Sequence, residues 1–202
     1  MAVKYIVENF EKKIGEWCFY EYEHISEIVG KSNIAFTNAK GDVAKKISSL
    51  GETAGKRAAE FIPKSARVCV LDMDAEQQLT PKDAKNFDYM VFGGILGTNP
   101  PAGRTKMIYE ADPKATKQWQ KRNLGKRQMS TDTAVNVAKQ VLDGKPMEKI
   151  EFEDDVELVM SKGRHEGESM ILPYRYIKDD KKKHGFVIAT KLLNYLKNKK
   201  GF

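Results

Sequence analysis

The chain has 202 residues, of which 41% are hydrophobic and 31% are charged. This length suits one main domain with a small appendage, and the composition is typical of a soluble globular protein. The sequence excludes a membrane span, because no apolar run approaches the roughly 18 residues that a span needs, and the first residues lack the long apolar region of a secretory signal. We therefore expect a cytoplasmic protein with no membrane partner.

The net charge of +7 favours anionic partners, with nucleic acid or the ribosome first, because lysine and arginine speed association with phosphates and displace their counterions. Much of the excess lies in two stretches, Lys117–Gln128 and Lys178–His184. The first also carries Trp119 among its bases, a combination that suits a nucleic-acid or substrate-binding face. A solvated lysine-rich surface without a function explains the same charge.

Strands and helices are predicted to alternate over the first 146 residues. Apolar patterns predict strands over 3–9, 33–38, 66–73, 88–94 and 118–124. Helical spacing and capping residues predict helices over 15–30, 42–50, 54–62, 80–87, 105–110 and 130–144. Asp42 and Thr80 are the expected N-caps of two of them. Such alternation is typical of an α/β fold with a mostly parallel sheet.

The pattern changes at Met147, after which alternating or continuous apolar runs replace the helical period. Two or three strands are predicted there, ahead of a last helix over 186–198. We therefore expect an α/β core over residues 1–146 and a β-rich section with a terminal helix over 147–202, packed on the core.

Cys18 and Cys69 are the only cysteines, and both have apolar neighbours in the sequence. Neither belongs to a C-x-x-C pair, so we expect buried core thiols and not a zinc or redox site. His24, His165 and His184 fall in unrelated contexts, so we expect no metal site and assign the histidines no catalytic role.

A glycine-rich loop follows the strand predicted at 88–94. Gly93, Gly94 and Gly97 lack the spacing of a dinucleotide-binding fingerprint, and Pro100 and Pro101 keep a helix from starting directly behind them. A phosphate cradle is therefore disfavoured. The glycines still allow the backbone to approach a flat ligand such as adenine, while a tight turn made for packing explains them equally well.

The segment Leu124–Ala134 (LGKRQMSTDTA) combines a glycine turn, two bases and a helix start. Ser130 or Thr131 as N-cap, with Asp132 in the first turn, is good helix chemistry that requires no function. The functional interpretation is favoured by two glycine-rich loops beside predicted strand ends, because ligands of open parallel sheets bind beyond the carboxyl ends of the strands.

Four stretches, in preserved order, resemble the small SPOUT-class methyltransferase family that includes the yeast arginine methyltransferase of ribosomal protein S3. They are Lys4–Tyr22, Phe87–Gly97 with Pro-Pro and Arg-Thr close behind, Leu124–Ala134 and Leu172–Tyr176. The resemblance implies S-adenosylmethionine as cofactor, and a mostly parallel sheet with helices on both faces whose C-terminal part forms a trefoil knot, a rare exception to unknotted topology. It also implies a monomer or a homodimer.

By the same resemblance, three segments would surround the cofactor. Its binding residues would be Leu71, Asp72, Phe92, Gly93, Gly94, Ile95, Leu96, Gly97, Leu124, Gly125, Gln128, Met129, Ser130 and Thr131. A bulky residue at Gly94 or Gly97 would then abolish cofactor binding and leave the fold intact. The chain departs from the family pattern at Thr98 and Lys126, where acids are common, which affects cofactor contacts or target choice.

An arginine acceptor has a pKa above about 12, so carboxylates have to hold its guanidinium and accept its proton. Glu8, Asp72 and Asp132 are the acids best placed at predicted strand ends or loops. We expect Glu8 and Asp132 to be catalytic together with Arg104, whose planar fork can orient a carboxylate or phosphate. The expected substrate-binding residues are Trp119, Lys126, Arg127, Tyr174 and Arg175. Edge acids, surface bases and packed aromatic side chains explain these residues without a function.

Two functions remain open. One is an S-adenosylmethionine-dependent methyltransferase acting on a ribosomal or translation-related macromolecule, and the other is a catalytically silent protein that binds RNA or the ribosome through its basic face. Within the first, the charge favours an RNA acceptor, whereas the resemblance favours a protein arginine.

Overall fold

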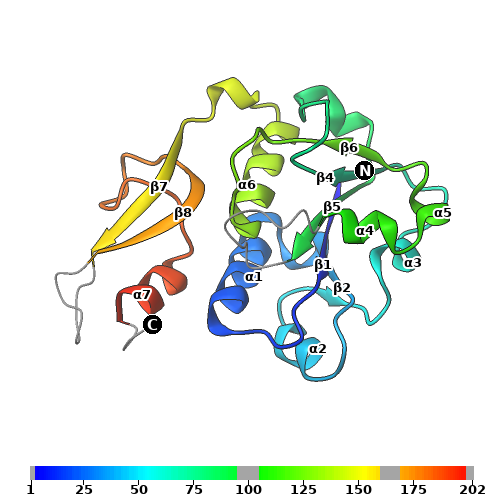
Figure 1. The fold of residues 1–202 in the computed structure, drawn as a ribbon, viewed down its shortest axis with the longest axis horizontal. Helices are drawn as coiled ribbons and strands as arrows, with labels where there is room; N and C mark the ends of the chain where they lie inside the picture. Colours follow the sequence, from blue (N-terminus) through cyan, green and yellow to red (C-terminus); the bar gives the residue numbers. More distant parts are fainter. Residues whose placement is uncertain (1–2, 95–104, 160–168, 199–202) are drawn as a thin grey trace.

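A computed structural model describes residues 3–94, 105–159 and 169–198, and its centre is a six-stranded sheet (Figure 1). Every neighbouring pair in this sheet is parallel. In spatial order the strands are β3 (Glu52–Thr53), β2 (Ile34–Thr37), β1 (Lys4–Asn9), β5 (Tyr89–Gly94), β4 (Val68–Leu71) and β6 (Gln120–Arg122). The expected α/β fold with a mostly parallel sheet is confirmed.

Helices cover both faces of this sheet. Alternate residues of each strand point to opposite sides, so both faces carry apolar side chains that the helices bury. Tyr5 and Val7 of β1 belong to the larger apolar cluster, and Ile6 between them belongs to a separate cluster on the other face. The larger cluster is covered by α1 (Glu16–Val29), α2 (Gly41–Ile47) and α6 (Thr131–Leu142). The other is covered by α3 (Ala58–Phe61), α4 (Lys106–Glu110) and α5 (Pro113–Thr116).

The longest helix, α1, follows the predicted helical spacing and buries Cys18, Tyr22, Ile25 and Val29 on the side that faces the sheet. It ends at Gly30, whose φ of +83° is a positive value that residues with a side chain rarely adopt. The 3-10 helices η1 (Lys31–Asn33), η2 (Pro81–Lys85) and η3 (Met147–Lys149) make shorter connections. Within the described ranges, none of the helices has the length and apolar character that crossing a membrane requires.

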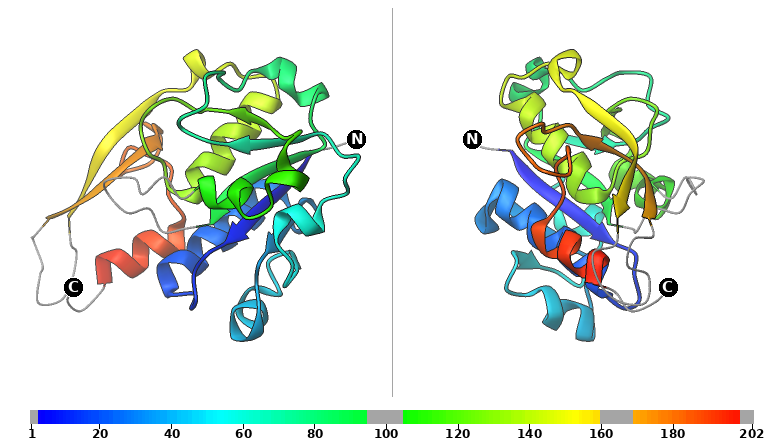
Figure 2. Two further views of the ribbon diagram at one scale, coloured as in Figure 1. Left: turned by 45° about the vertical axis from the view of Figure 1, so that its right-hand side comes forward. Right: turned by 90° about the vertical axis from the view of Figure 1, so that its left-hand side faces the viewer.

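The C-terminal residues form a second small sheet from β7 (Phe152–Val159) and β8 (Ser169–Ile177), which pair antiparallel. Asp155, with a φ of +53°, lies where the register of this pair shifts. One side of the pair and α7 (Thr190–Asn198) bury a third apolar cluster, against which Trp17 and Tyr20 of α1 also pack. Both views of Figure 2 accordingly show α7 alongside α1.

Four predicted helices differ from the structure. The helix expected over 42–50 begins at Gly41 with Lys40 as its N-cap and ends at Ile47, so Asp42 lies within the first turn and is not the cap. The helix expected over 54–62 is only the single turn α3, because Ala54 donates to the carbonyl of Phe36 in an extension of the sheet. The segment 80–87 has the expected Thr80 cap and proline start, but it forms a 3-10 helix. The last helix begins at Thr190 and not at 186, because Val187 still donates to the carbonyl of Ile177 in β8.

Another correction concerns Gly94, the last residue of β5. A side chain there would lie 2.5 Å from Val7 Cγ1 and would overlap the hydroxyl of Tyr22. That hydroxyl lies 3.2 Å from the Gly94 carbonyl oxygen, to which it donates. Gly94 is therefore part of the core, and the expectation that a bulky residue there would leave the fold intact is wrong. Gly97 lies outside the described residues.

We predict that Gly94→Ala lowers the free energy of unfolding by roughly 1–3 kcal/mol, because the added methyl group displaces Tyr22 and Val7. Urea denaturation measures this change. Gly93→Ala is the matched control, since a side chain there meets only the end of Ile108 at 3.9 Å. Equal stability of the two variants would contradict this explanation of Gly94.

Candidate functional site

Buried polar side chains gather at the carboxyl ends of the parallel strands, the edge where open α/β sheets bind ligands. Glu8 and Asn9 end β1, Thr37 ends β2, Asp72 follows β4 and Asn123 follows β6, and each is at most 7% exposed. Burying polar groups costs free energy unless they are hydrogen-bonded. Their hydrogen-bond partners therefore show which of these side chains remain available to a ligand.

Glu8 is completely buried and already paired within the chain. It accepts hydrogen bonds from Arg57 Nε at 2.5 Å and from the backbone N–H of Ala58 at 2.9 Å. Burial raises the pKa of Glu8, while the hydrogen bond from Ala58 and the charge of Arg57 act in the opposite direction. Arg57 also donates to the Met107 carbonyl at 2.7 Å, so this ion pair joins α3 and α4 to the sheet.

Asp72 connects the end of β4 to α4. Its Oδ2 accepts the hydroxyl of Tyr109 at 2.7 Å, and its Oδ1 accepts the backbone N–H of Asp74 at 3.0 Å. Burial, followed by this hydrogen bond, raises the pKa of Tyr109. Lys121 Nζ lies 3.7 Å from the centre of the Tyr109 ring and 3.9 Å from Asp72, so a cation already faces this carboxylate.

The loop between β6 and α6 requires its glycine. Gly125 has a φ of +96°, a conformation that other residues rarely adopt, and its N–H donates to Asn123 Oδ1 at 3.0 Å. Lys126 Nζ donates to the carbonyl of Met73 at 3.0 Å, which joins this loop to the one after β4. Of the expected cofactor-binding segments, the structure therefore brings those after β4 and β6 together.

The other side of the same loop is held by β8. The N–H of Arg175 donates to the carbonyl of Gln128 at 2.8 Å, and Arg175 forms a bridge with Met129. The Arg175 guanidinium makes two hydrogen bonds of 2.8 Å to Asp154 of β7. Arg127 pairs with Asp155 at 2.5 Å. These two expected substrate-binding bases therefore lie beside the loop, and both are engaged with β7.

The side chain of Gln128 ends in a buried oxygen, Oε1, that has no hydrogen-bond partner among the residues that the structure describes. Such an atom is costly unless a ligand or water supplies a donor, and an amide can present either its oxygen or its nitrogen at this position. A ligand with an amino group, such as adenine, matches this requirement. The loop thus fits the cofactor that the sequence predicts.

Asp132, at the start of α6, is buried with two partners. Its Oδ1 accepts the Ser130 hydroxyl at 2.6 Å, and its Oδ2 lies 2.7 Å from His24 Nδ1 on α1. The sequence assigns His24 no role, because the three histidines fall in unrelated contexts. The structure pairs it with a residue 108 positions away, and no local pattern could show that partner.

Glu21 is a second buried carboxylate at this junction that sequence reasoning missed. It accepts Trp17 Nε1–H at 2.7 Å and hydrogen bonds from Thr131, the first residue of α6. Burial raises the pKa of Glu21 well above its ordinary value, and the charge of Asp132 adds to the effect. Glu21 and His24 lie three residues apart, a spacing that puts them on one helix face. The signal that the sequence offers for this junction is a glutamate and a histidine spaced to lie on one face of the predicted first helix.

The remaining predicted site residues are separated. Trp119 precedes β6, so it lies at the amino end of that strand, where it packs against the apolar cluster of α3 and α4. Tyr174 is buried in the cluster beneath β7 and β8. Phe92 is a core residue that stacks on Tyr5 with ring centres 6.3 Å apart. Ile95, Leu96, Gly97, Thr98 and Arg104 lie outside the described residues.

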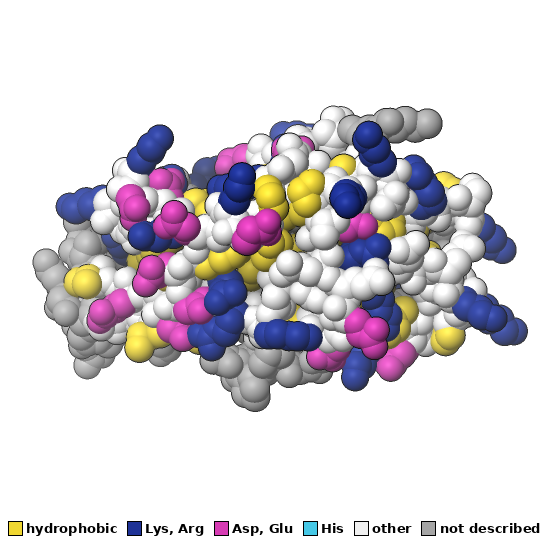
Figure 3. All heavy atoms as spheres, turned by 90° about the horizontal axis from the view of Figure 1, so that it is seen from above, with side chains coloured by type: hydrophobic (Ala, Val, Ile, Leu, Met, Phe, Trp, Pro, Cys, Tyr) yellow, Lys and Arg dark blue, Asp and Glu magenta, His cyan; other side chains and the backbone are white. Residues whose placement is uncertain are grey.

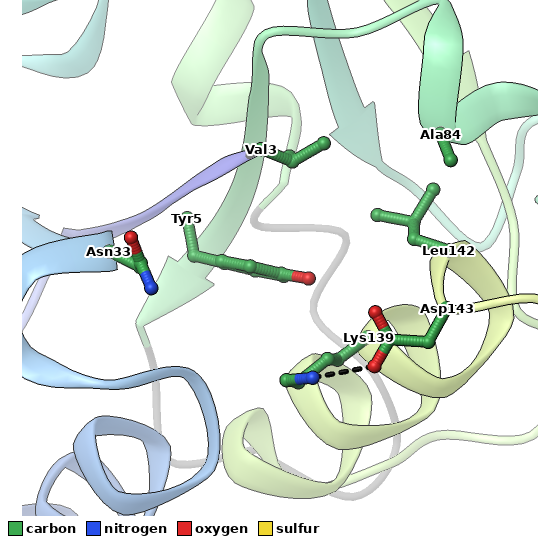
Figure 4. Close-up of a pocket in the computed structure, with 7 residues that line it drawn as sticks. All are labelled: Val3, Tyr5, Asn33, Ala84, Lys139, Leu142 and Asp143. Atoms are coloured by element: carbon green, nitrogen blue, oxygen red, sulfur yellow. Dashed lines mark hydrogen bonds and ion pairs between the residues drawn. The ribbon is translucent and has the colours of Figure 1, made fainter. Parts of the chain in front are cut away.

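A cavity of about 250 Å³ opens at the opposite edge of the sheet (Figure 4). Its lining comes from the start of β1, from the 3-10 helices η1 and η2, and from the end of α6 with the residue after it, including Tyr5, Lys139, Leu142 and Asp143. Of the predicted site residues that the structure describes, none lines it. The cavity therefore does not belong to the candidate site at the carboxyl edge.

Comparison with known proteins identifies the family. Residues 4–201 match the family model described as "Protein arginine N-methyltransferase SFM1-like". The chain belongs to this family. SFM1 of Saccharomyces cerevisiae is 34% identical over 192 residues, which cover 88% of this chain and 87% of the yeast protein. The expectation of a methyltransferase is confirmed at the level of the family.

Solved structures of yeast SFM1 have the same fold. The complex with SAM has a TM-score of 0.84 at 32% identity and covers 98% of this chain and 91% of that one. The complex with SAH has a TM-score of 0.83 at 31% identity and covers 96% and 94%. Trm10 of Thermococcus kodakaraensis, at 19% identity and a TM-score of 0.58 over 72% of this chain and 96% of its own, shares the fold alone. The SPOUT-like fold class is confirmed.

We predict that Glu21 makes the protein less stable as the pH rises. Because its folded-state pKa is raised from 4.5, the folded protein keeps a proton that the unfolded chain loses, so the free energy of unfolding falls through this window. Glu21→Gln removes the loss. As the pH rises above about 4.5, the variant should therefore gain stability relative to wild type in urea denaturation.

Glu16→Gln, on the first turn of the same helix, is the control with the opposite sign. The hydrogen bond from Lys46 lowers the pKa of Glu16, so wild type should gain stability over this variant as the pH rises. A Glu21→Gln variant that loses stability relative to wild type at high pH would show that Glu21 is ionised in the folded protein.

Proposed function

We propose that this protein transfers a methyl group from S-adenosylmethionine to an arginine side chain of a protein. The observation that carries this proposal is the match to the SFM1-like family over residues 4–201. Complexes of yeast SFM1 with SAM, SAH and MTA support S-adenosylmethionine as the cofactor. The buried Gln128 oxygen in the Gly125 loop, which has no hydrogen-bond partner within the described ranges, supports it independently.

The cofactor would lie against the loops at the carboxyl ends of β4, β5 and β6. The proposed binding residues in the described ranges are Leu71, Asp72, Phe92, Gly93, Gly94, Leu124, Gly125, Gln128, Met129, Ser130 and Thr131. When bound, S-adenosylmethionine supplies the methyl group. The ion pairs of Arg175 and Arg127 with β7 hold the Gly125 loop in shape. We propose that residues 147–202 act as a separate section that supports this loop, and that the C-terminal part of the core forms a trefoil knot.

Among the three acids expected from the sequence, Asp132 is best suited to the acceptor chemistry. Glu8 is bound by Arg57, and Lys121 lies beside Asp72. Within the described residues, Asp132 forms an ion pair with His24 alone. We therefore assign Asp132 to the catalytic machinery, and Glu8 to the packing of α3 and α4 against the sheet.

For the acceptor, we propose an arginine of a ribosomal or translation-related protein in the cytoplasm. The net charge of +7 still favours RNA as the alternative. On the face in Figure 3, however, lysine and arginine side chains are interspersed with acidic ones and do not form a continuous basic patch. This distribution gives the RNA alternative no support on that face.

Methyl transfer into a cell extract tests the acceptor class. With S-adenosylmethionine labelled in its methyl group, we expect the label to survive nuclease, to be lost with protease, and to appear in methylarginine after hydrolysis. Label that is sensitive to nuclease would instead support RNA. Failure to bind S-adenosylmethionine in calorimetry, at about millimolar concentration, would leave a silent binding protein as the remaining function.

Gly125→Ala tests the cofactor loop. We predict that the variant binds S-adenosylmethionine about tenfold more weakly, because a side chain costs roughly 1–2 kcal/mol at this φ and changes the loop. Gly144→Ala is the matched control, since Gly144 has a φ of +108° but follows the far end of α6 with open space around it. It should lose stability similarly and keep full affinity in calorimetry. Equal affinities of the two variants would contradict the assignment of the loop.

A further inference from the structure

Methylation of an arginine releases one proton, which another group has to accept. The guanidinium keeps its single positive charge in the product, so each methyl group added releases one proton from nitrogen. The free side chain holds its protons up to a pKa above about 12, so a base has to take the proton as the nitrogen–carbon bond forms. That base should lie at the carboxyl edge of the sheet and should reach solvent, to which the proton is finally lost.

The pair of Asp132 and His24 has the geometry of an oriented base. Asp132 accepts from His24 Nδ1 at 2.7 Å, which places the imidazole proton on Nδ1 and leaves the lone pair on Nε2. Within the described residues, His24 Nε2 has no hydrogen-bond partner. The side chain of His24 is 15% exposed, whereas that of Asp132 is 2% exposed. The ring thus extends from a buried carboxylate towards solvent.

The Asp132 carboxylate lies where it can compensate the charge of an imidazolium formed during the reaction. A buried carboxylate is costly unless a cation compensates it, and His24 is its only ion-pair partner in the part of the chain that the structure describes. When Nε2 takes up a proton, the ring becomes that cation. The same carboxylate therefore orients the ring and stabilises it in its protonated form, as the aspartate does in catalytic triads.

The other titratable groups around the pair are poorly suited to this role. On α1, burial raises the pKa of Glu21, which favours its neutral form, and Glu23 pairs with Lys191 of α7 at 2.6 Å. On β8, burial raises the pKa values of Tyr174 and Tyr176, which keeps their hydroxyls protonated. Histidine is the side chain whose charge ordinarily changes near neutral pH.

We propose that His24 is the base that receives the proton from the acceptor guanidinium and that Asp132 is its positioning residue, a role that rests on the arginine methyltransferase function proposed above. The N–H bond of the guanidinium breaks, and its electron pair remains on the nitrogen that gains the methyl group. The bond between the methyl carbon and the sulfonium sulfur of S-adenosylmethionine breaks at the same time, and its electron pair leaves with the sulfur as S-adenosylhomocysteine. The proton forms a bond to His24 Nε2 and then passes to water. The hydrogen bond from Nδ1 to Asp132 persists throughout.

The simpler explanation is that the hydrogen bond only ties α1 to α6, and His24→Asn separates the two roles. The asparagine amide can still donate to Asp132 from the position of Nδ1, but it cannot accept a proton. If His24 is the base, the variant should keep its melting temperature and its affinity for S-adenosylmethionine, and methylate an arginine peptide about a hundredfold more slowly. Added imidazole should restore part of the rate.

Nitrogen NMR of the imidazole provides a readout that does not depend on activity. Wild type should carry the proton of the neutral ring on Nδ1, and Asp132→Asn, whose amide can donate to the ring, should shift it towards Nε2. His184→Asn is the control, because His184 lies beyond β8 against Phe186 and is not part of the site. It should leave both the rate and the His24 signals unchanged.

Two results would overturn the proposal: a His24→Asn variant that methylates at the wild-type rate, or a wild-type ring protonated on Nε2. Wild-type protein that binds no cofactor and methylates no arginine would instead contradict the proposed function. The NMR measurement would then still decide whether Asp132 orients His24 as described.

Discussion

The contact between α1 and the first turn of α6 is the interaction on which the candidate site depends. Glu21 accepts hydrogen bonds from Thr131, and His24 meets Asp132, so two α1 side chains secure the residues where the Gly125 loop becomes a helix. Leaving such buried groups without partners costs about 1–3 kcal/mol each. The start of α6 is therefore held far more firmly than its own N-cap residue could hold it.

The rest of the architecture builds on this junction. α1 follows β1, one of the two central strands of the sheet, and its other surface receives α7 and the apolar cluster beneath β7 and β8. β8 in turn hydrogen-bonds to the loop that leads into α6, through Arg175 and Gln128. The first helix, the Gly125 loop and the C-terminal section are thus in contact with one another. A change in the helix or in the C-terminal section is therefore expected to alter the Gly125 loop.

Elements with strong local patterns were predicted well. β1, α1, β5 and α6 have apolar spacing and end signals that belong to a single conformation, and the structure has them within a few residues of their expected bounds. The predictions failed where tertiary hydrogen bonds compete with helix formation. Ala54 and Val187 each pair with a neighbouring strand, and the extended backbone that this pairing requires is incompatible with the dihedral angles of a helix.

The sequence by itself determined the fold class, the family and the glycine turn at Gly125, because residue periodicity and glycine positions act over a few neighbours along the chain. Only the tertiary structure decided which acids are available. Glu8 meets Arg57, and Asp132 meets His24 across 108 positions, and these pairings follow from how α3, α1 and α6 pack against the sheet. The electrostatic role of a carboxylate depends on the charges within a few ångströms of it, and spacing along the sequence carries no information about those neighbours.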